Sequence, residues 1–599
     1  MSQKKSYRIK KCRQIYKYTD KQYKRRKHIL DVAEQQIVEE HLETLRLAIG
    51  DRDRVTGTAS GKILEGLGKG SLKKTWFESL RDSTLSLAVA LGIAVIVRQS
   101  WFELYEIPSG SMRPTLKEKD RLIVSKNQYG INIPLTTKHL LFDDKLVKRG
   151  GITVFTSAGM DVPDSNVMYF YLFPGKKQLI KRLIGKPGDS IYFYGGKLYG
   201  VDKNGHDISS ELQSKEMDGI DYTPFLSFEG KPTMQQGTGP LQASVILNQM
   251  NQPVAEMKIS KSGKIEGHTL GFADHYFDLW GFENYGMGKL LLHAQAKKLG
   301  YLEKGMPRGK AYLVFRHHAD VKGAELAQDM MGNIRPQLSM ETSVIPLEDE
   351  HVAALTKGLY TARLVAKNGY LYRWDYQSSI GKRTPYTPKM KDLPDGTYEF
   401  FGGQAYQVHA QGVTTKVSEY HPLANLNLKE LALFYNMGID PYTHFAPSEK
   451  GSLDAQRFVY FRHGDLVSMG VPFMKKDDPI LNNFLLREKE KVANSTTYKP
   501  YFPFVDNYTP SLELIQERGI KVPEKNYLVL GDNFAMSGDS RAFGFVPESN
   551  MRGVPDLIFW PFEKRTGAPS QAPYPFFTKP RVTIWILGTI TFTLAGMAY

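Results

Sequence analysis

The pattern of apolar and polar residues divides the chain into stretches with different expected structures. Between residues 29 and 49 the apolar residues recur at helical spacing, and Gly50 is a good helix stop. This segment is predicted to be an amphipathic packing helix without chemistry of its own. Its apolar positions are Leu30, Ala33, Ile37, Leu45 and Ile49.

The segment from residue 80 to 102 is the best candidate for a transmembrane helix. Its centre, residues 83–97, has no charged side chain, although this run is shorter than the roughly 20 residues that span a bilayer. Arg98 can extend its side chain to the interface, and Trp101 and Phe102 are typical of an aromatic belt. A buried helix of a soluble domain is the alternative. Cations on the N-terminal side of the uncharged centre favour a cytoplasmic N-terminal side by the positive-inside rule; they are Lys73, Lys74 and Arg81.

A second apolar run, residues 582–599, contains no charge. It is a candidate for a second membrane segment, either a return span or an interfacial anchor. Lys579 and Arg581 precede it and would lie on the side that the positive-inside rule disfavours.

The middle of the chain, residues 206–500, shows a different pattern. Short alternating runs separated by turn residues predict a mainly β insertion of unknown role, with one helical stretch at Gly288–Lys298. The alternating runs are Ala311–Phe315, Gly369–Trp374 and Arg457–Phe461. Histidines follow two of these runs, but a metal site would need a further ligand, so His317, His318 and His463 are interpreted as core or surface residues.

Composition narrows the class of protein. The chain has 599 residues, 41% of them hydrophobic and 24% charged, which is typical of a globular protein with roughly three or four domains. Its formal net charge is +16, and many of the cations lie between residues 4 and 27. We interpret this segment as a solvated basic arm on the cytoplasmic side of a membrane; an RNA-binding arm is the alternative, because tyrosines interleave with the cations. The single cysteine, Cys12, excludes an intramolecular disulfide.

The first segment with candidate chemistry directly follows the apolar helix. In YEIPSGSMRPTL, residues 105–116, Pro108 and Pro114 bracket a turn that contains Ser109, Gly110 and Ser111. Such a turn can hold a hydroxyl outward and let a substrate backbone approach at the glycine. Taken alone, it is an ordinary turn.

Two further segments have unusual patterns. LIKRLIGKPGD, residues 179–189, is a predicted strand with Lys181 in its middle, where a lysine either protects an edge or is a desolvated amine. A predicted hairpin follows at residues 191–199. In YLVLGDNFAMSGDSRAFGFVP, residues 527–547, an apolar strand enters a loop rich in Gly, Asp, Asn and Ser. That loop has too few carboxylates for a calcium site.

Together, the three segments resemble bacterial signal peptidase I, the serine–lysine leader peptidase of exporting membranes. The three motifs occur in the family's order behind a membrane helix, the GGKLYG hairpin follows the lysine strand, and Val522-Pro523-Glu524 leads into the GDN loop. The resemblance implies a mainly β fold with a signal-peptidase-like catalytic domain, an N-terminal transmembrane helix and an unusually large insertion. The expected divisions are a basic arm with an amphipathic helix (1–79), the transmembrane helix (80–102), the catalytic domain in two parts (103–205 and 501–565), the insertion (206–500) and the second candidate membrane segment (582–599).

The resemblance also implies roles for particular residues. Ser111 would be the nucleophile and Lys181 its general base, with Ser109 donating a hydrogen bond to the oxyanion. Ser537 would orient the lysine amine, while Asp539 and Arg541 would brace their loop. A lysine has an ordinary pKa of about 10.4, and burial can lower it by roughly 3–5 units. The substrate would add as a strand between two segments, whose binding residues are Tyr105, Ile107, Pro108, Leu179 and Ile180.

The implied function is removal of signal peptides from exported preproteins, after small residues at Ala-x-Ala-like sites, by a serine endopeptidase of the bacterial inner membrane whose catalytic domain faces outward. Expected partners are these signal peptides and the lipid bilayer, with the export machinery as a further candidate. No cofactor, metal or nucleic acid is expected. Three alternatives stay open: a self-cleaving relative like the LexA-type repressors, a membrane-tethered binding or assembly protein on a peptidase scaffold, and a specialised peptidase with one substrate.

Overall fold

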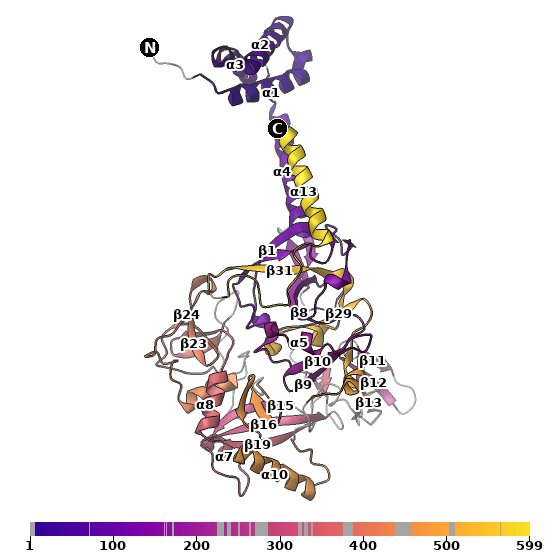
Figure 1. The fold of residues 1–599 in the computed structure, drawn as a ribbon, viewed down its shortest axis with the longest axis vertical. Coiled ribbons are helices and arrows are strands. Elements are labelled where there is room, and N and C mark those ends of the chain that lie inside the picture. The colour runs from indigo at the N-terminus through magenta and orange to yellow at the C-terminus, as the bar shows by residue number, and fades with distance from the viewer. Residues whose placement is uncertain are drawn as a thin grey trace. The chain divides into compact units, whose positions relative to one another are not determined.

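The computed structural model divides the chain into two compact units, residues 1–96 and residues 97–599 (Figure 1). It describes residues 6–598 apart from several short segments. The segments outside the description are 71, 161, 163–164, 170–172, 224–232, 237–240, 250–251, 263–264, 270–284, 321–325, 329–333, 337–338, 375–386, 438–456, 502–508 and 564.

The first unit is a small helical bundle of α1 (Ile9–Arg26), α2 (Val32–Gly50) and α3 (Arg54–Lys69). The expectation of a solvated arm is therefore wrong for α1. One side of this basic helix is buried, because Cys12, Ile15 and Tyr23 join the apolar core of the bundle. The predicted packing helix is α2, and the Asp31 side chain caps its first turn by accepting a hydrogen bond from the Glu34 N–H.

The apolar helix α4 (Trp76–Ile96) has no buried residue. It begins before residue 80 because Thr75 and Glu78 form a reciprocal cap, in which each backbone N–H donates to the other's side chain. Within the described part of the chain, Trp76–Trp101 is the one helix long and apolar enough to cross a membrane.

The second unit is built around a seven-stranded antiparallel sheet with the order β1-β2-β31-β5-β8-β29-β30. Four of these strands precede residue 205 and three follow residue 525, so both ends of the unit's sequence build one sheet. The bounds are β1 (Phe102–Glu106), β2 (Arg121–Ser125), β5 (Ile152–Thr156), β8 (Gln178–Gly185), β29 (Asn526–Leu530), β30 (Val546–Pro547) and β31 (Met551–Trp560).

The hairpin predicted at residues 191–199 is present. Gly195 and Gly196 form its turn with φ of +57° and +74°, a conformation that favours glycine. The hairpin belongs to a three-stranded sheet with the order β10-β9-β28, which α5 and α11 contact. The bounds are β9 (Ser190–Tyr194), β10 (Lys197–Val201), β28 (Ile520–Lys521), α5 (Ser209–Leu212) and α11 (Leu512–Arg518).

The large middle of the chain is rich in β structure, as predicted. Its strands form a six-stranded sheet, a five-stranded sheet, a four-stranded sheet and a two-stranded one. The bounds are β19 (Ser339–Leu347), β16 (Ala311–Asp320), β15 (Tyr285–Leu292), β25 (Phe458–Arg462), β26 (Asp465–Ser468) and β27 (Val471–Met474) in the first; β21 (Tyr370–Arg373), β20 (Leu364–Lys367), β22 (Gly396–Phe401), β23 (Gln404–Val408) and β24 (Thr414–Lys416) in the second; β11 (Thr233–Gln236), β12 (Leu241–Gln249), β13 (Gln252–Ser260) and β14 (Ile265–Thr269) in the third; and β17 (Leu326–Gln328) and β18 (Ile334–Pro336) in the last.

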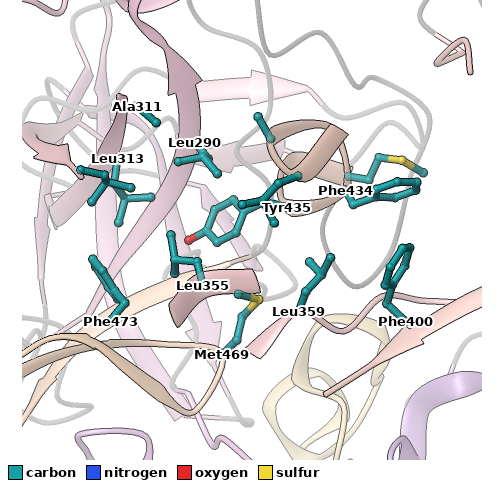
Figure 2. Close-up of a cluster of buried hydrophobic side chains, with 14 of the residues drawn as sticks. Leu290, Ala311, Leu313, Leu355, Leu359, Phe400, Phe434, Tyr435, Met469 and Phe473 are labelled. Atoms are coloured by element: carbon teal, nitrogen blue, oxygen red, sulfur yellow. The ribbon is translucent and has the colours of Figure 1, made fainter. Parts of the chain in front are cut away.

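One shared apolar core joins the six-stranded and five-stranded sheets (Figure 2). Leu290 and Leu313 contribute from the first sheet and Phe400 from the second, while Phe434 and Tyr435 come from a helix between them. The helices of this region are α7 (His293–Lys298), α8 (Asp349–Gly358), α9 (Leu428–Met437) and α10 (Pro479–Asn494).

The helix predicted at Gly288–Lys298 is only half right. Residues up to Leu292 lie in β15, and α7 begins at His293. Leu290 and Leu291 are both buried, in different core clusters, so this strand is covered on both faces and shows no alternation in its sequence. His317 is a core residue that hydrogen-bonds Ser343, with 2.8 Å between Nε2 and Oγ. The side chain of His318 lies outside the described residues.

Short elements complete the second unit. The last helix, α13, follows β31 and includes most of the second apolar run. Its first turn is fixed by Arg581, whose guanidinium donates to Asp556 Oδ2 and Ser125 Oγ, each at 2.9 Å. The remaining bounds are β3 (Ile131–Asn132), β4 (His139–Leu140), β6 (Asn166–Tyr169), β7 (Phe173–Lys176), α12 (Ser540–Phe543) and α13 (Lys579–Ala598).

Candidate active site

Ser111 and Lys181 meet in a buried position. Ser111 lies in a single 3-10 turn, Gly110–Met112, between β1 and β2, and Lys181 lies in the middle of β8. The distance from Lys181 Nζ to Ser111 Oγ is 3.0 Å, and the same amine donates to the carbonyl of Ile180 at 3.0 Å. The two side chains, which are 70 positions apart in the sequence, are therefore within the distance that proton transfer requires.

The surroundings of Lys181 make its amine a better base. The residue is 4% exposed, and burial lowers the pKa of Lys181 to about 8 despite the opposing carboxylates of Asp539 and Asp532. None of the hydrogen bonds described for this amine goes to a carboxylate. A larger fraction of the lysine is thus the free amine near neutral pH than in an exposed lysine.

The loop after β29 closes over this pair. Gly531 is required there, because a Cβ at this position would lie 2.1 Å from Ser537 Oγ and 2.6 Å from the carbonyl oxygen of Ser111. The Gly531 N–H donates to Asp539 at 2.8 Å. Asp539 and Arg541 form a buried bidentate ion pair with distances of 2.9 and 2.7 Å. Burial would raise the pKa of Asp539, but Arg541 holds it below its usual value.

Asn533 connects this loop to the serine turn, a contact that the sequence did not reveal. Its backbone N–H donates to the carbonyl of Ser111 at 3.1 Å, and its side-chain amide donates to the carbonyl of Gly110 at 3.1 Å. Asn533 thus fixes the backbone on both sides of the nucleophile candidate. The position of Asn533 in the Gly-Asp-Asn run was the sequence feature that could have indicated this role.

A second buried ion pair supports the strand that carries the lysine. Arg182 donates to both carboxylate oxygens of Asp532, at 2.8 and 2.7 Å, and both residues are fully buried. Thr115 and Tyr222 also donate to Asp532. This bidentate geometry links β8, the GDN loop and the segment that follows the serine turn.

The two supporting serines have different surroundings. Ser109 is exposed, next to the buried Ser111, so its hydroxyl is accessible to a substrate. Ser537 is buried against Gly531, and its hydroxyl lies beside the Asp539 carboxylate, whose pKa it helps to lower.

The predicted substrate-binding residues line two strand edges. In the first half of β8, Leu179 and Ile180 pair with β5 alone among the described strands, because β29 pairs only from Arg182 onward. On the other side, Tyr105 lies in β1, whose described partner is β2. The backbone of Ile107 is already engaged: its N–H donates to Asp120 and its C=O accepts from Lys119. Pro108 is exposed beside the serine turn.

A second buried lysine lies beside the same strands. Lys126 Nζ forms an ion pair with Glu103 at 2.8 Å and donates to Tyr105 Oη at 2.6 Å and to Gln178 Oε1 at 2.8 Å. Burial lowers the pKa of Lys126 to about 8, against the effect of Glu103. Nothing in the local sequence, RLIVSKNQ, indicated that this lysine is buried.

One group of potential metal ligands occurs in the described part of the chain: Glu350, His351 and Asp478. The ligand atoms of His351 and Asp478 already have structural partners. His351 Nδ1 accepts from the Glu348 N–H, its Nε2 bonds Asp478 at 2.8 Å, and Asp478 caps α10. We therefore treat the group as part of the fold.

Comparison with known proteins agrees with this geometry. The model of the family described as "Signal peptidase, peptidase S26" matches residues 80–251 and 464–560. Over these ranges the chain is similar to the signal peptidase family. The matched ranges include both members of the buried pair and the loop that covers them.

Individual relatives match shorter stretches. Proteins named signal peptidase I are 38% identical over 121 residues in Buchnera aphidicola subsp. Schizaphis graminum and 31% identical over 172 residues in Pseudomonas aeruginosa. Another, from Leptolyngbya laminosa, is 33% identical over 124 residues. These matches cover 20%, 28% and 20% of this chain and 32%, 52% and 48% of the relatives. The chain thus spans between about a third and a half of the length of these relatives.

Proposed function

We propose that this chain is a membrane-bound signal peptidase I that removes signal peptides with a serine–lysine dyad. The observation that carries the proposal is the 3.0 Å contact between Ser111 Oγ and Lys181 Nζ in a buried site. The match to the signal peptidase family model and the lowered pKa of Lys181 support it.

In the first step, the neutral amine of Lys181 takes the proton of Ser111 as Oγ attacks the carbonyl carbon of the scissile bond. The lysine can keep donating an N–H to the Ile180 carbonyl while its lone pair faces the serine. The tetrahedral intermediate collapses when the ammonium of Lys181 protonates the leaving amine, which leaves an ester on Ser111.

Water then hydrolyses the ester, with Lys181 again acting as base. The oxyanion in both steps needs hydrogen-bond donors. We assign this role to the Ser111 N–H and the exposed hydroxyl of Ser109; such donors contribute on the order of 100-fold to 1,000-fold to the rate. Asn533 holds the carbonyls of Gly110 and Ser111, so the N–H groups of the turn have a fixed direction.

The substrate would bind as an added strand beside the first half of β8. Leu179 and Ile180 have one described strand neighbour, β5, which leaves their other edge for a peptide. Tyr105 and Ile180 pack on an apolar cluster around Ile107, Met112 and Val154. This cluster would form the floor of shallow pockets for small residues, as in an Ala-x-Ala-like site.

Membrane attachment would come first from α4. Its exposed apolar surface suits lipid, and the cations before it favour a cytoplasmic N-terminus with the second unit on the outer face of a bacterial inner membrane. We also propose that α13 enters the membrane. Although Arg581 lies at its start, this charge is paired with Asp556. Retention of the chain in membranes after alkaline extraction, with and without residues 582–599, tests the contribution of α13.

The decisive experiment is cleavage of a preprotein with a standard signal sequence, in detergent, by wild type, Ser111→Ala and Lys181→Ala. Cleavage after the small-residue site by wild type alone, with all three proteins folded by circular dichroism, is the expected result. Equal cleavage by the variants would refute the dyad, and no cleavage by folded wild type would refute the proposed function.

A further inference from the structure

A carboxylate from the middle of the chain lies beneath the serine turn. Glu399 belongs to β22 in the five-stranded sheet and is fully buried. It accepts hydrogen bonds from Arg113 at 2.8 Å and from Lys117 at 2.5 Å, both in the segment that follows Ser111. Arg363 of its own sheet is the third partner, at 3.1 Å.

The contact with Arg113 leads directly to the nucleophile candidate. Arg113 also pairs with the buried Glu118. Its Nε and Nη2 both donate to Glu118 Oε2, at 2.8 and 2.5 Å. The other oxygen of Glu118 lies only 2.7 Å from where a Cβ on Gly110 would stand, and the Arg113 side chain lies 3.1 Å from that point. The Gly110–Ser111 backbone therefore rests on the Arg113–Glu118 pair, which Glu399 holds in place from the other side.

The charges show why Glu399 matters. Burial would raise its pKa, but Arg113, Lys117 and Arg363 hold the pKa of Glu399 well below its usual range, so it is ionised. Without this anion, Arg113 would keep only Glu118 among its described carboxylate partners, and Lys117 and Arg363 would lose the carboxylate with which they pair. An uncompensated buried cation either moves or draws in water, and either change would shift the turn that begins at Gly110.

Other contacts connect the five-stranded sheet that contains Glu399 to the seven-stranded sheet and to the segment after the serine turn. The Trp560 indole N–H donates to the carbonyl of Gln411 at 3.1 Å, and Glu563 accepts from the N–H and hydroxyl of Thr414 at 2.6 and 2.9 Å. Gly412 packs against Lys119 so closely that a Cβ would lie 2.8 Å from the lysine's Cβ. The placement of Glu399 is thus built into the interface of the two sheets.

We infer that Glu399 is a positioning residue for Ser111, so that part of the middle region belongs to the catalytic apparatus. Glu399 acts through Arg113 and does not touch the reacting atoms. This inference rests on the proposed function for its kinetic test, and it predicts a structural effect on the turn that does not depend on activity.

The kinetic test compares wild type with Glu399→Gln, which keeps the shape and removes the charge. We expect kcat to fall on the order of 100-fold, as for a displacement of a catalytic group by about 1 Å. The KM for the preprotein should change less than about twofold, because the substrate edge of β8 is untouched. In a cycle with Arg113→Gln, the double variant should lose little more than either single variant, because both act through one contact.

The matched control is Glu488→Gln. Glu488 is also a buried carboxylate of the middle region, where it accepts from Tyr498, Ser343 and the Tyr501 N–H, and none of these contacts involves the serine turn. This variant tests a loss of stability in the region without a loss of positioning, so its kcat should stay within about twofold of wild type. If Glu399→Gln keeps wild-type kcat, or loses activity only as Glu488→Gln does, the inference is wrong while the proposed function stands.

Amide hydrogen exchange of residues 107–120 tests the inference by a measurement that does not depend on catalytic activity. Exchange in this segment should be faster in Glu399→Gln than in wild type, and unchanged in Glu488→Gln. Unchanged exchange in Glu399→Gln would overturn the inference even in a chain that cleaves no preprotein.

Discussion

Two buried lysines in the second unit, Lys181 and Lys126, invite comparison. Both are almost fully buried, and burial lowers the pKa of each to about 8. Their contacts differ. Lys126 directs its amine at three acceptors, one of them the carboxylate of Glu103, whereas Lys181 directs its amine at the Ser111 hydroxyl and one backbone carbonyl.

The difference shows that burial alone does not make a lysine a general base. An ammonium has three N–H donors, and in Lys126 all three have an acceptor. Loss of its proton would remove one of the two cations that pair with the buried Glu103, the other being Arg98, and weakening a buried ion pair in this way is costly. Lys181 forms no ion pair with a carboxylate of the described residues, and its neighbour is a hydroxyl whose proton it can accept. We therefore assign proton transfer to Lys181 and a structural role to Lys126.

The largest expected effect comes from removing each amine in turn. Lys181→Met should lower preprotein cleavage by about 1,000-fold or more, because the serine loses its base. Lys126→Met should keep activity within about tenfold of wild type. Steady-state cleavage of one preprotein by the two variants measures this contrast, and a loss of similar size in both would contradict the assignment.

Breaking the structural pair should mainly affect stability. Glu103→Gln leaves Lys126 buried without its counter-ion, which typically costs about 3–5 kcal/mol of the free energy of unfolding. Glu106→Gln, on the same strand, is the control, because its partners Lys119 and Arg121 are more exposed and such pairs contribute about 0–1 kcal/mol. Denaturant unfolding of the full chain in detergent should distinguish the two variants. Equal midpoints of unfolding would mean that the Glu103–Lys126 pair does not contribute to stability.

The pH dependence of cleavage distinguishes the lysines in another way. A base must be deprotonated, so the rate should rise as the pH rises through about 8 and then level off, with roughly a tenfold fall per unit of pH below that value. Lys126→Met should leave this midpoint within about half a unit. A midpoint that disappears in Lys126→Met, or a rate that is flat between pH 6 and 8, would show that Lys181 is not the titrating base.

The smallest effect is expected for Ser537→Ala. The hydroxyl lies beside Gly531 and Asp539, and the hydrogen bonds described for the Lys181 amine go to Ser111 and Ile180 and not to Ser537. Its removal should therefore lower kcat by less than about tenfold and leave the pH midpoint unchanged. A loss of about 100-fold would show that the hydroxyl orients the lysine once substrate is bound, as the family resemblance implies.

Local patterns in the sequence were enough to identify much of this protein. The apolar run predicted α4 to within a few residues at its start, the Gly195-Gly196 turn predicted its hairpin, and alternation predicted the β-rich middle. The motifs around Ser111, Lys181 and Asp539 were recognisable because each depends on a short segment whose backbone form requires particular residues, as Gly531 illustrates.

Other features were outside the reach of local patterns. The basic segment was expected to be solvated, yet α1 buries one side. Its apolar residues Cys12, Ile15 and Tyr23 are buried only because α2 and α3 cover them, which the local sequence does not show. Likewise, the part of β15 from Gly288 onward was predicted as a helix, because a strand buried on both faces shows no alternation.

The sequence by itself therefore determined the family resemblance, the fold class and the two candidate reacting groups, since these reside in contiguous motifs. Only the tertiary structure decided which charges meet: Glu399 reaches Arg113 from 286 positions away, and Arg182 reaches Asp532 from 350. Buried ion pairs of this kind leave no local signal. A charged residue can be buried only where the fold brings its partner, and the fold of the whole chain fixes that place.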